Sequence, residues 1–166
     1  ELSMARIARE AGISKALLYH YFPSKRELFV ATLQQSAAEV ESLTRPDPEL
    51  APLEALSGSL DAFLGWIEEH PVAYAKLIES SGQPEVRDLV ADIRDRTSQR
   101  ILEGVAPEGA PPKLRAAVRG WLWLMDGMIL DWLDHRDIER GELRDLLLGA
   151  LAGTVMASGE GEALGG

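Results

Sequence analysis

The stretch of sequence that decides the fold is residues 7–14, which read Ile7-Ala8-Arg9-Glu10-Ala11-Gly12-Ile13-Ser14. Gly12 supplies the backbone freedom that a sharp turn needs. Ser14 is a favourable N-cap for a second helix, and Ile13 is placed to fill the angle between the two helices. The pattern predicts short helices over residues 3–10 and 14–21 that together form a helix-turn-helix.

The second of these helices has an unusual outward face. Leu18 and Phe22 are four residues apart and are expected to face the core. This leaves an outward set of Lys15, Ala16, Leu17, Tyr19 and His20. Exposed leucine and aromatic side chains on one short helix are unfavourable unless a partner covers them. Because the second helix of a helix-turn-helix lies in the major groove, the pattern indicates DNA as that partner.

Residues 3–33 resemble the DNA-binding signature of the TetR family of bacterial regulators, over about a fifth of the chain. The resemblance rests on Gly12-Ile13-Ser14 and on the run Leu18-Tyr19-His20-Tyr21-Phe22-Pro23-Ser24-Lys25-Arg26-Glu27-Leu28. It implies a divergent ligand-binding body and two C-terminal helices that dimerise. It also implies a first helix before Ser3, so we expect a further N-terminal segment.

The resemblance implies a set of DNA contacts. Lys15, Ala16 and Leu17 match positions near base edges, where lysine can donate to guanine and apolar groups can touch thymine methyls. The phosphate-binding positions are Ser3, Tyr19, His20, Tyr21 and Lys25. Ser14, the cap of the second helix, completes the predicted set. Leu17 stands where the family often has a small hydroxyl residue, so no base preference is predicted.

Charge is distributed unevenly along the chain. The net charge is −10, yet residues 1–30 carry five basic and three acidic residues, a net +2, which leaves −12 for the rest. A basic end on an acidic body is compatible with a nucleic-acid contact at one end. The absence of cysteine excludes thiolate chemistry and zinc fingers and fits a cytoplasmic location. The most apolar stretch, residues 117–133, is interrupted by charges, so no membrane segment is expected.

Helical periodicity continues through the chain without a convincing strand pattern, which predicts an all-α fold. Prolines or glycines separate the further helices, expected at residues 24–43, 53–70, 71–79, 84–104, 113–135 and 140–157. The predicted domains are a helix-turn-helix domain with its connecting helix (residues 1–44) and a helical ligand-binding and dimerisation domain (45–158). The glycine-rich residues 159–166 are expected to form a disordered tail.

The last two predicted helices are apolar on more than one face. A small domain cannot cover both completely, whereas a two-fold dimer can. Glycines on these helices allow close backbone approach, although each costs about 1 kcal/mol relative to alanine. The predicted dimer interface comprises Gly120, Trp123, Leu124, Gly127, Leu130, Leu147, Gly149 and Gly153.

A small-molecule pocket of mainly apolar character is expected in the body, mainly from the family resemblance. Its predicted lining is Trp66, His70, Tyr74, Trp121, Met125 and Asp126. The simpler interpretation of Asp126 is an acid balanced by an arginine or by solvent. His70 also suits a helix end, where the dipole favours its positive charge.

The sequence thus predicts a ligand-responsive DNA-binding regulator, a repressor that a small molecule releases from a palindromic operator. An enzyme is not expected, because the three histidines lie far apart and no phosphate loop or metal-ligand spacing is present. No cofactor is expected. The alternative is a helical protein-interaction module that has lost DNA binding.

Overall fold

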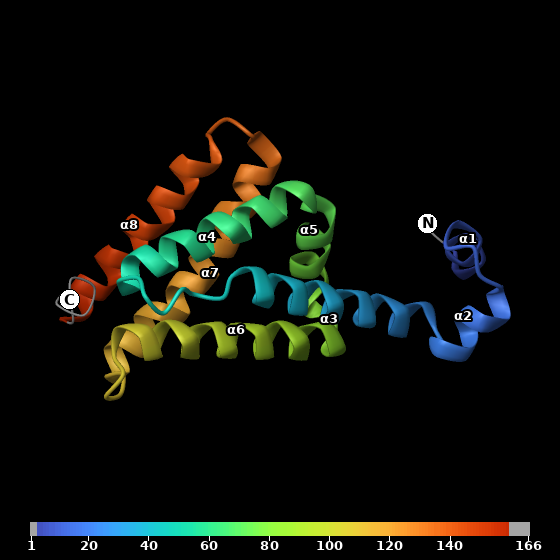
Figure 1. Cartoon of the computed structure of the whole chain (residues 1–166), viewed down its shortest axis with the longest axis horizontal. Coiled ribbons are helices and arrows are strands. Elements are labelled where there is room, and N and C mark those ends of the chain that lie inside the picture. The colour runs from blue at the N-terminus through green and yellow to red at the C-terminus, as the bar shows by residue number, and fades with distance from the viewer. Residues whose placement is uncertain (1–2, 160–166) are drawn as a thin grey trace. The chain divides into compact units, whose positions relative to one another are not determined.

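The computed structural model describes residues 3–159, which form eight α-helices and one short 3-10 helix, without strands (Figure 1). The all-α prediction is therefore confirmed. The chain divides into two compact units, residues 1–38 and 39–166, each with a hydrophobic core of its own. Apart from Gly159, the predicted tail lies outside the described residues.

The first unit contains α1 (Met4–Glu10), α2 (Lys15–Tyr21) and most of α3 (Lys25–Leu43). Its small core is formed by Met4, Ala8 and Leu18, with Ile7, Phe22 and Leu28 packed around them. Leu18 and Phe22 thus face inward as their spacing predicts. One stripe of apolar residues holds α1, α2 and the start of α3 together, which leaves the remaining faces of α2 to solvent.

The second unit, which we call the body, contains the remaining helices. They are the end of α3, α4 (Pro52–Glu69), α5 (Pro71–Glu79), the 3-10 helix η1 (Ser80–Gly82), α6 (Pro84–Val105), α7 (Pro112–His135) and α8 (Arg140–Ser158). Four of these helices begin at a proline, whose fixed φ angle suits the first helical turn and whose missing N–H would be unpaired there in any case. These prolines also explain why the predicted boundaries lie close to the observed ones.

The core of the body forms around α7, which packs against α5, α6 and α8, while α4 packs along α8 (Figure 1). Trp121 of α7 is buried, and its indole Nε1 donates a 2.8 Å hydrogen bond to the carbonyl oxygen of Leu147 on α8. Trp132 donates similarly to the carbonyl oxygen of Ile138, at 2.9 Å, and so pins the connection between α7 and α8. Both tryptophans bury large apolar surfaces without leaving their polar atoms unpaired.

No helix within residues 3–159 is long and apolar enough to span a membrane.

Candidate functional site

The exposed face of α2 is the candidate nucleic-acid interface. Leu18 is the buried residue of this seven-residue helix, and all the others are exposed. Leu17 is 43% exposed, Tyr19 41% and Tyr21 68%. Lys15, Ala16 and His20 are exposed as well. The helix therefore presents apolar, aromatic and basic groups to solvent, and only its Leu18 side chain is buried in the core.

Local backbone chemistry fixes where α2 begins. Gly12 has φ +68°, a left-handed conformation that L-residues with a side chain rarely adopt. The N–H of Ile13 donates to the carbonyl oxygen of Ala8 at 3.0 Å, which closes the turn after α1. Ser14 Oγ then accepts a 3.1 Å hydrogen bond from the N–H of Leu17 and caps α2. The turn and the cap together set the direction in which α2 leaves α1.

Ile13 differs from the prediction. It is 37% exposed, and the core of the first unit is formed without it. The contacts that hold the angle between α1 and α2 come instead from Met4, Ala8 and Leu18. The expected role of Ile13 as a plug between the two helices is therefore corrected.

The predicted DNA-contact residues lie on three segments of the first unit. Ser3 caps α1 by accepting from the N–H of Arg6, and Lys25 lies exposed in the first turn of α3. On α2, the Lys15 ammonium lies 5.6 Å from the centre of the Tyr19 ring. His20 and Tyr21 form an edge-to-face pair with ring centres 5.3 Å apart, so their orientations support each other.

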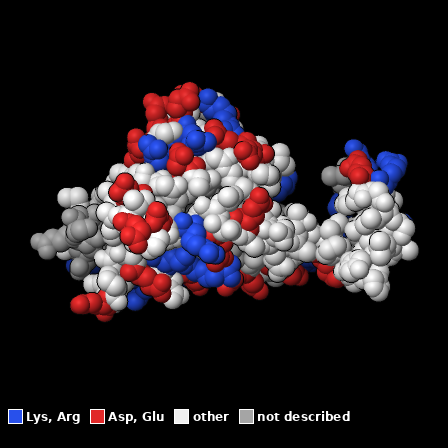
Figure 2. Space-filling view, in the orientation of Figure 1, with Lys and Arg blue, Asp and Glu red and all other residues white. Residues whose placement is uncertain are grey.

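The charged groups of both units can be followed in Figure 2. On the face shown, the body carries acidic side chains together with patches of basic ones, and the basic side chains visible on the helix-turn-helix unit gather near α1. Within α1, Arg6 forms an exposed ion pair with Glu10 at 2.9 Å. An exposed pair of this kind contributes little to stability.

The expected dimer interface is largely an open surface of α7 and α8. Trp123 is 64% exposed and Leu124 40% exposed. Space is open around all four of the predicted glycines, Gly120, Gly127, Gly149 and Gly153, and Leu130 is half-buried. Leu147 is different, because it is completely buried in the core of the body. It offers no surface to a second copy, so its assignment to the interface is corrected.

Four of the six residues predicted to line a ligand pocket belong to the core of the body: Trp66, Tyr74, Trp121 and Met125. His70 is exposed at the junction of α4 and α5, where its ring stacks on Trp66 at a centre-to-centre distance of 4.6 Å. Because these residues fill the core or cover a helix end, we do not assign them to a pocket. Within residues 3–159, Trp66 Nε1 is a buried nitrogen without a hydrogen-bond partner.

Asp126 lies at the centre of a buried polar cluster. One carboxylate oxygen accepts a 2.7 Å hydrogen bond from the Tyr74 hydroxyl, and the other pairs with the Arg94 guanidinium. The simpler interpretation of this acid, an arginine partner, is therefore the one observed. Burial, and secondarily the negative charge of Asp126, raises the pKa of Tyr74 well above its ordinary value of 10.0.

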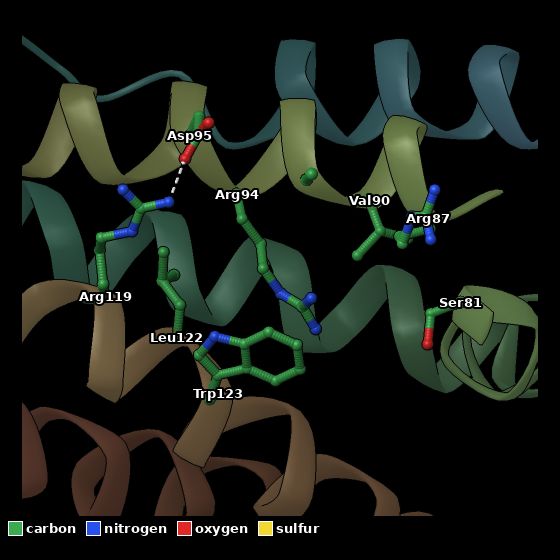
Figure 3. Close-up of a pocket in the computed structure, with 9 residues that line it drawn as sticks. Ser81, Arg87, Val90, Arg94, Asp95, Arg119, Leu122 and Trp123 are labelled. Atoms are coloured by element: carbon green, nitrogen blue, oxygen red, sulfur yellow. Dashed lines mark hydrogen bonds and ion pairs between the residues drawn. The ribbon is translucent and has the colours of Figure 1, made fainter. Parts of the chain in front are cut away.

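Next to this cluster, a pocket of about 350 Å³ opens between η1, α6 and α7. It is lined by Ser81, Arg87, Val90, Ala91, Arg94, Asp95, Arg119, Leu122 and Trp123 (Figure 3). We call it the α6–α7 pocket. None of the six predicted lining residues contributes to it. The signal in the sequence was the set of arginines on α6 and α7, but the sequence alone does not indicate that Arg87, Arg94 and Arg119 line one pocket.

Within residues 3–159, no group of three or more histidine or acidic side chains is arranged to hold a metal ion.

Comparison with known proteins places the chain in a family. Residues 1–32 match the family model of bacterial regulatory proteins of the tetR family, and residues 52–153 match the tetracyclin repressor-like C-terminal domain. The chain is 26% identical over 137 residues to the HTH-type transcriptional regulator BetI of Rhizobium meliloti, which covers 78% of this chain and 66% of that protein. It is 33% identical over 117 residues to the transcriptional activator FasR of Mycolicibacterium smegmatis, which covers 68% of this chain and 53% of that protein.

Solved structures give the same result. A tetR-family transcriptional regulator from Streptomyces coelicolor superposes with a TM-score of 0.89 at 28% identity, over 99% of this chain and 78% of that one. A TetR-like regulator from Rhodococcus sp. RHA1 superposes with a TM-score of 0.67, also at 28% identity, over 91% of this chain and 82% of that one. The two family models together match most of the chain, which thus belongs to the TetR family of bacterial transcriptional regulators.

Proposed function

We propose that the chain is a dimeric, ligand-responsive regulator that binds double-stranded DNA by inserting α2 into the major groove. The observation that carries the proposal is the exposed face of α2, where leucine and tyrosine side chains are open to solvent on a helix whose start is set by Gly12 and Ser14. A groove that accepts this face would cover its apolar groups and place its polar groups against the duplex.

The residues of this face divide between two kinds of contact. Lys15, Ala16 and Leu17 form the first turn of α2, the part that reaches base edges when a recognition helix enters the groove. Donation from Lys15 to guanine and contact of Leu17 with thymine methyls would provide sequence readout. The phosphate contacts, which fix position without reading sequence, would come from Ser3, Tyr19, His20, Tyr21 and Lys25.

The test is fluorescence anisotropy with a selected operator and with random DNA. Tyr19→Phe and Lys25→Ala are expected to weaken binding to both DNAs by similar factors. Lys15→Ala is expected also to reduce the preference for the operator, by about 1–3 kcal/mol. Lys76→Ala, at an exposed lysine on α5 of the body, is the matched control and should change neither value. Equal effects of all four substitutions would refute the division of roles.

Dimerisation is proposed through the exposed faces of α7 and α8. Leu124 and Gly149 lie on these faces together with exposed Leu146 and Met156. Such an apolar surface is typical of a contact between copies. Two recognition helices related by a two-fold axis would read a palindrome with half-sites about 34–36 Å apart, or a multiple of this distance.

Two glycine variants test the dimer. Gly149→Arg adds a large charged side chain on α8, and Gly58→Arg adds the same side chain on α4. Both variants are expected to fold, because a Cβ atom added at either glycine would meet no other side chain or neighbouring helix within 4 Å. Analytical ultracentrifugation should show a monomer for Gly149→Arg and a dimer for Gly58→Arg. A dimer in both cases would refute this interface.

The proposed response to ligand is a shift between two states of the dimer. An effector that binds the body better in the state incompatible with DNA would release the operator, the behaviour of a repressor. A full reversal from mostly bound to mostly free requires about 5.5 kcal/mol of differential affinity. The test is operator binding measured with increasing effector. An effector that binds the body and leaves operator affinity unchanged would refute the response.

A further inference from the structure

We infer that the α6–α7 pocket binds a small amphipathic monocarboxylate, whose anionic end meets Arg94 and whose apolar part rests against Trp123 and the neighbouring apolar side chains. The inference rests on the proposed function, because it names the chemical class of the effector. It is carried by the positioning of Arg94, the hydrogen-bonding groups of the pocket and the apolar lining.

The charges around the pocket limit how much negative charge a ligand can bring. The lining carries three arginines, Arg87, Arg94 and Arg119, and one acid, Asp95. Two further acids pair with these arginines from outside the lining, Asp126 with Arg94 and Asp88 with Arg87 at 3.5 Å, so the local charges balance, in a chain whose net charge is −10. A ligand with a single negative charge therefore adds less uncompensated charge than a phosphate, which carries close to two at neutral pH.

Arg94 is held in place before any ligand arrives. Its side chain is 17% exposed and that of Asp126 is 12% exposed. The Tyr74 hydroxyl holds the other carboxylate oxygen of Asp126 at 2.7 Å, so the acid cannot turn away from the arginine. Among the hydrogen bonds of residues 3–159, Arg94 donates to Asp126 alone, which leaves most of its five N–H donors available.

The stacking of Arg94 on Trp123 orients those donors. The guanidinium carbon lies 3.7 Å from the centre of the indole ring, and Figure 3 shows the side chain reaching from α6 to lie beside that ring on α7. A guanidinium that stacks on an aromatic face directs its N–H groups sideways, in the plane in which a carboxylate can accept two of them. Positioning by Asp126 and stacking on Trp123 thus make Arg94 a fixed anion-binding fork.

The other polar groups of the pocket favour an acceptor over a donor. Asp95 already accepts a 2.7 Å hydrogen bond from Arg119, and the Ser81 hydroxyl donates to the carbonyl oxygen of Ile78 at 2.6 Å. A cationic ligand would meet arginines and find no unpaired acid in the lining. An anion would find the remaining arginine N–H groups, so the hydrogen-bonding groups of the pocket indicate an anionic ligand.

The apolar part of the lining gives the ligand its second property. Val90 and Leu122 form the buried wall of the pocket, Ala91 adds a small side chain, and Trp123 contributes an exposed ring. The volume of about 350 Å³ lies at the lower end of the range for small-molecule sites. The pocket therefore suits a compact aromatic or short aliphatic group attached to a carboxylate.

Isothermal titration calorimetry of the full chain tests the inference. The probes are benzoate, phenylacetate, cyclohexanecarboxylate and hexanoate, each compared with its uncharged amide and with phenethylamine as a cation. At least one carboxylate is expected to bind about tenfold or more tightly than its amide, the difference that a hydrogen bond to a charged group provides. The amine is expected not to bind.

Variants assign the binding to the pocket. Arg94→Met combined with Asp126→Asn removes both charges, avoids a lone buried acid and retains an acceptor for Tyr74, so this protein is expected to fold. It should lose carboxylate binding by about tenfold or more. Arg119→Gln should weaken carboxylate binding a few-fold. Arg115→Gln, one turn earlier on α7 and outside the lining, is the matched control and should bind as the parent does.

Three results would overturn the inference: failure of every carboxylate in the set to bind, equal binding of acid and amide, or unchanged binding in the Arg94→Met/Asp126→Asn protein. The proposed function has a separate readout, which is retention of the unliganded chain on DNA. DNA binding without carboxylate binding would remove this inference alone. Carboxylate binding without DNA binding would remove the proposed function and keep the pocket assignment.

Discussion

The ion pair between Arg94 and Asp126 can be tested by comparing a single variant with a double variant. In Arg94→Met, the Asp126 carboxylate stays buried and loses its charge partner, while the Tyr74 hydroxyl remains its hydrogen-bond donor. Breaking a buried pair by removing one partner costs about 3–5 kcal/mol, whereas replacing both charges is often close to neutral. Because the Arg94 side chain is partly exposed, we expect the lower end of this range, about 3 kcal/mol.

The assay is urea unfolding followed by circular dichroism, at one protomer concentration so that dimerisation affects every variant alike. Arg94→Met should lower the free energy of unfolding by about 3 kcal/mol, and Arg94→Met with Asp126→Asn should recover most of this loss. The reasoning fails if Arg94→Met lowers the free energy of unfolding by less than about 1 kcal/mol, which is the contribution of an exposed ion pair. It also fails if the double variant is no more stable than the single one.

Three further predictions concern other parts of the fold. Gly12→Ala should destabilise the helix-turn-helix by about 1–2 kcal/mol and Gly12→Asn by less, because the φ angle of Gly12 is +68° and the space around the residue is open. Hydrogen exchange of the α1 and α2 amides measures both losses, and equal exchange in the two variants would contradict the prediction. The free energy of unfolding should fall as pH rises above 10.0, because the pKa of Tyr74 is raised in the folded state; its stabilising contribution is complete below the unfolded-state pKa and is lost above it. Tyr74→Phe should reduce this alkaline loss, measured by urea unfolding between pH 8 and pH 11, and an identical pH profile would contradict the assignment. Leu147→Ala should lower the free energy of unfolding by about 2–5 kcal/mol, against less than about 0.5 kcal/mol for Val72→Ala on the surface, and similar losses would contradict the observed burial.

The helical fold could be predicted because its signals are local. Gly12 and Ser14 mark the turn and the cap of α2, and the prolines at 52, 71, 84 and 112 mark helix starts. Each acts through its own backbone geometry and does not depend on distant residues. The small core of the first unit followed from spacing too, since Leu18 and Phe22 recur at the helical period.

The body was harder to predict because its polar sites depend on contacts between helices. Asp126 could be recognised as an unusual acid, but its partners Arg94 and Tyr74 lie 32 and 52 residues away in the sequence. Leu147 and Leu146 are neighbours of the same residue type, yet one is completely buried and the other is 55% exposed. On a helix that is apolar nearly all round, periodicity does not indicate which face the protomer covers for itself.

The central claim, that α2 reads DNA in a two-fold symmetric arrangement, is tested most directly by selecting bound sequences from a random DNA pool with the full-length protein. The account predicts a palindrome in the selected sequences, and it predicts that this preference weakens in Lys15→Ala but not in Lys76→Ala. Selected sequences without symmetry, or a pool that stays random because the protein retains no DNA, would contradict it.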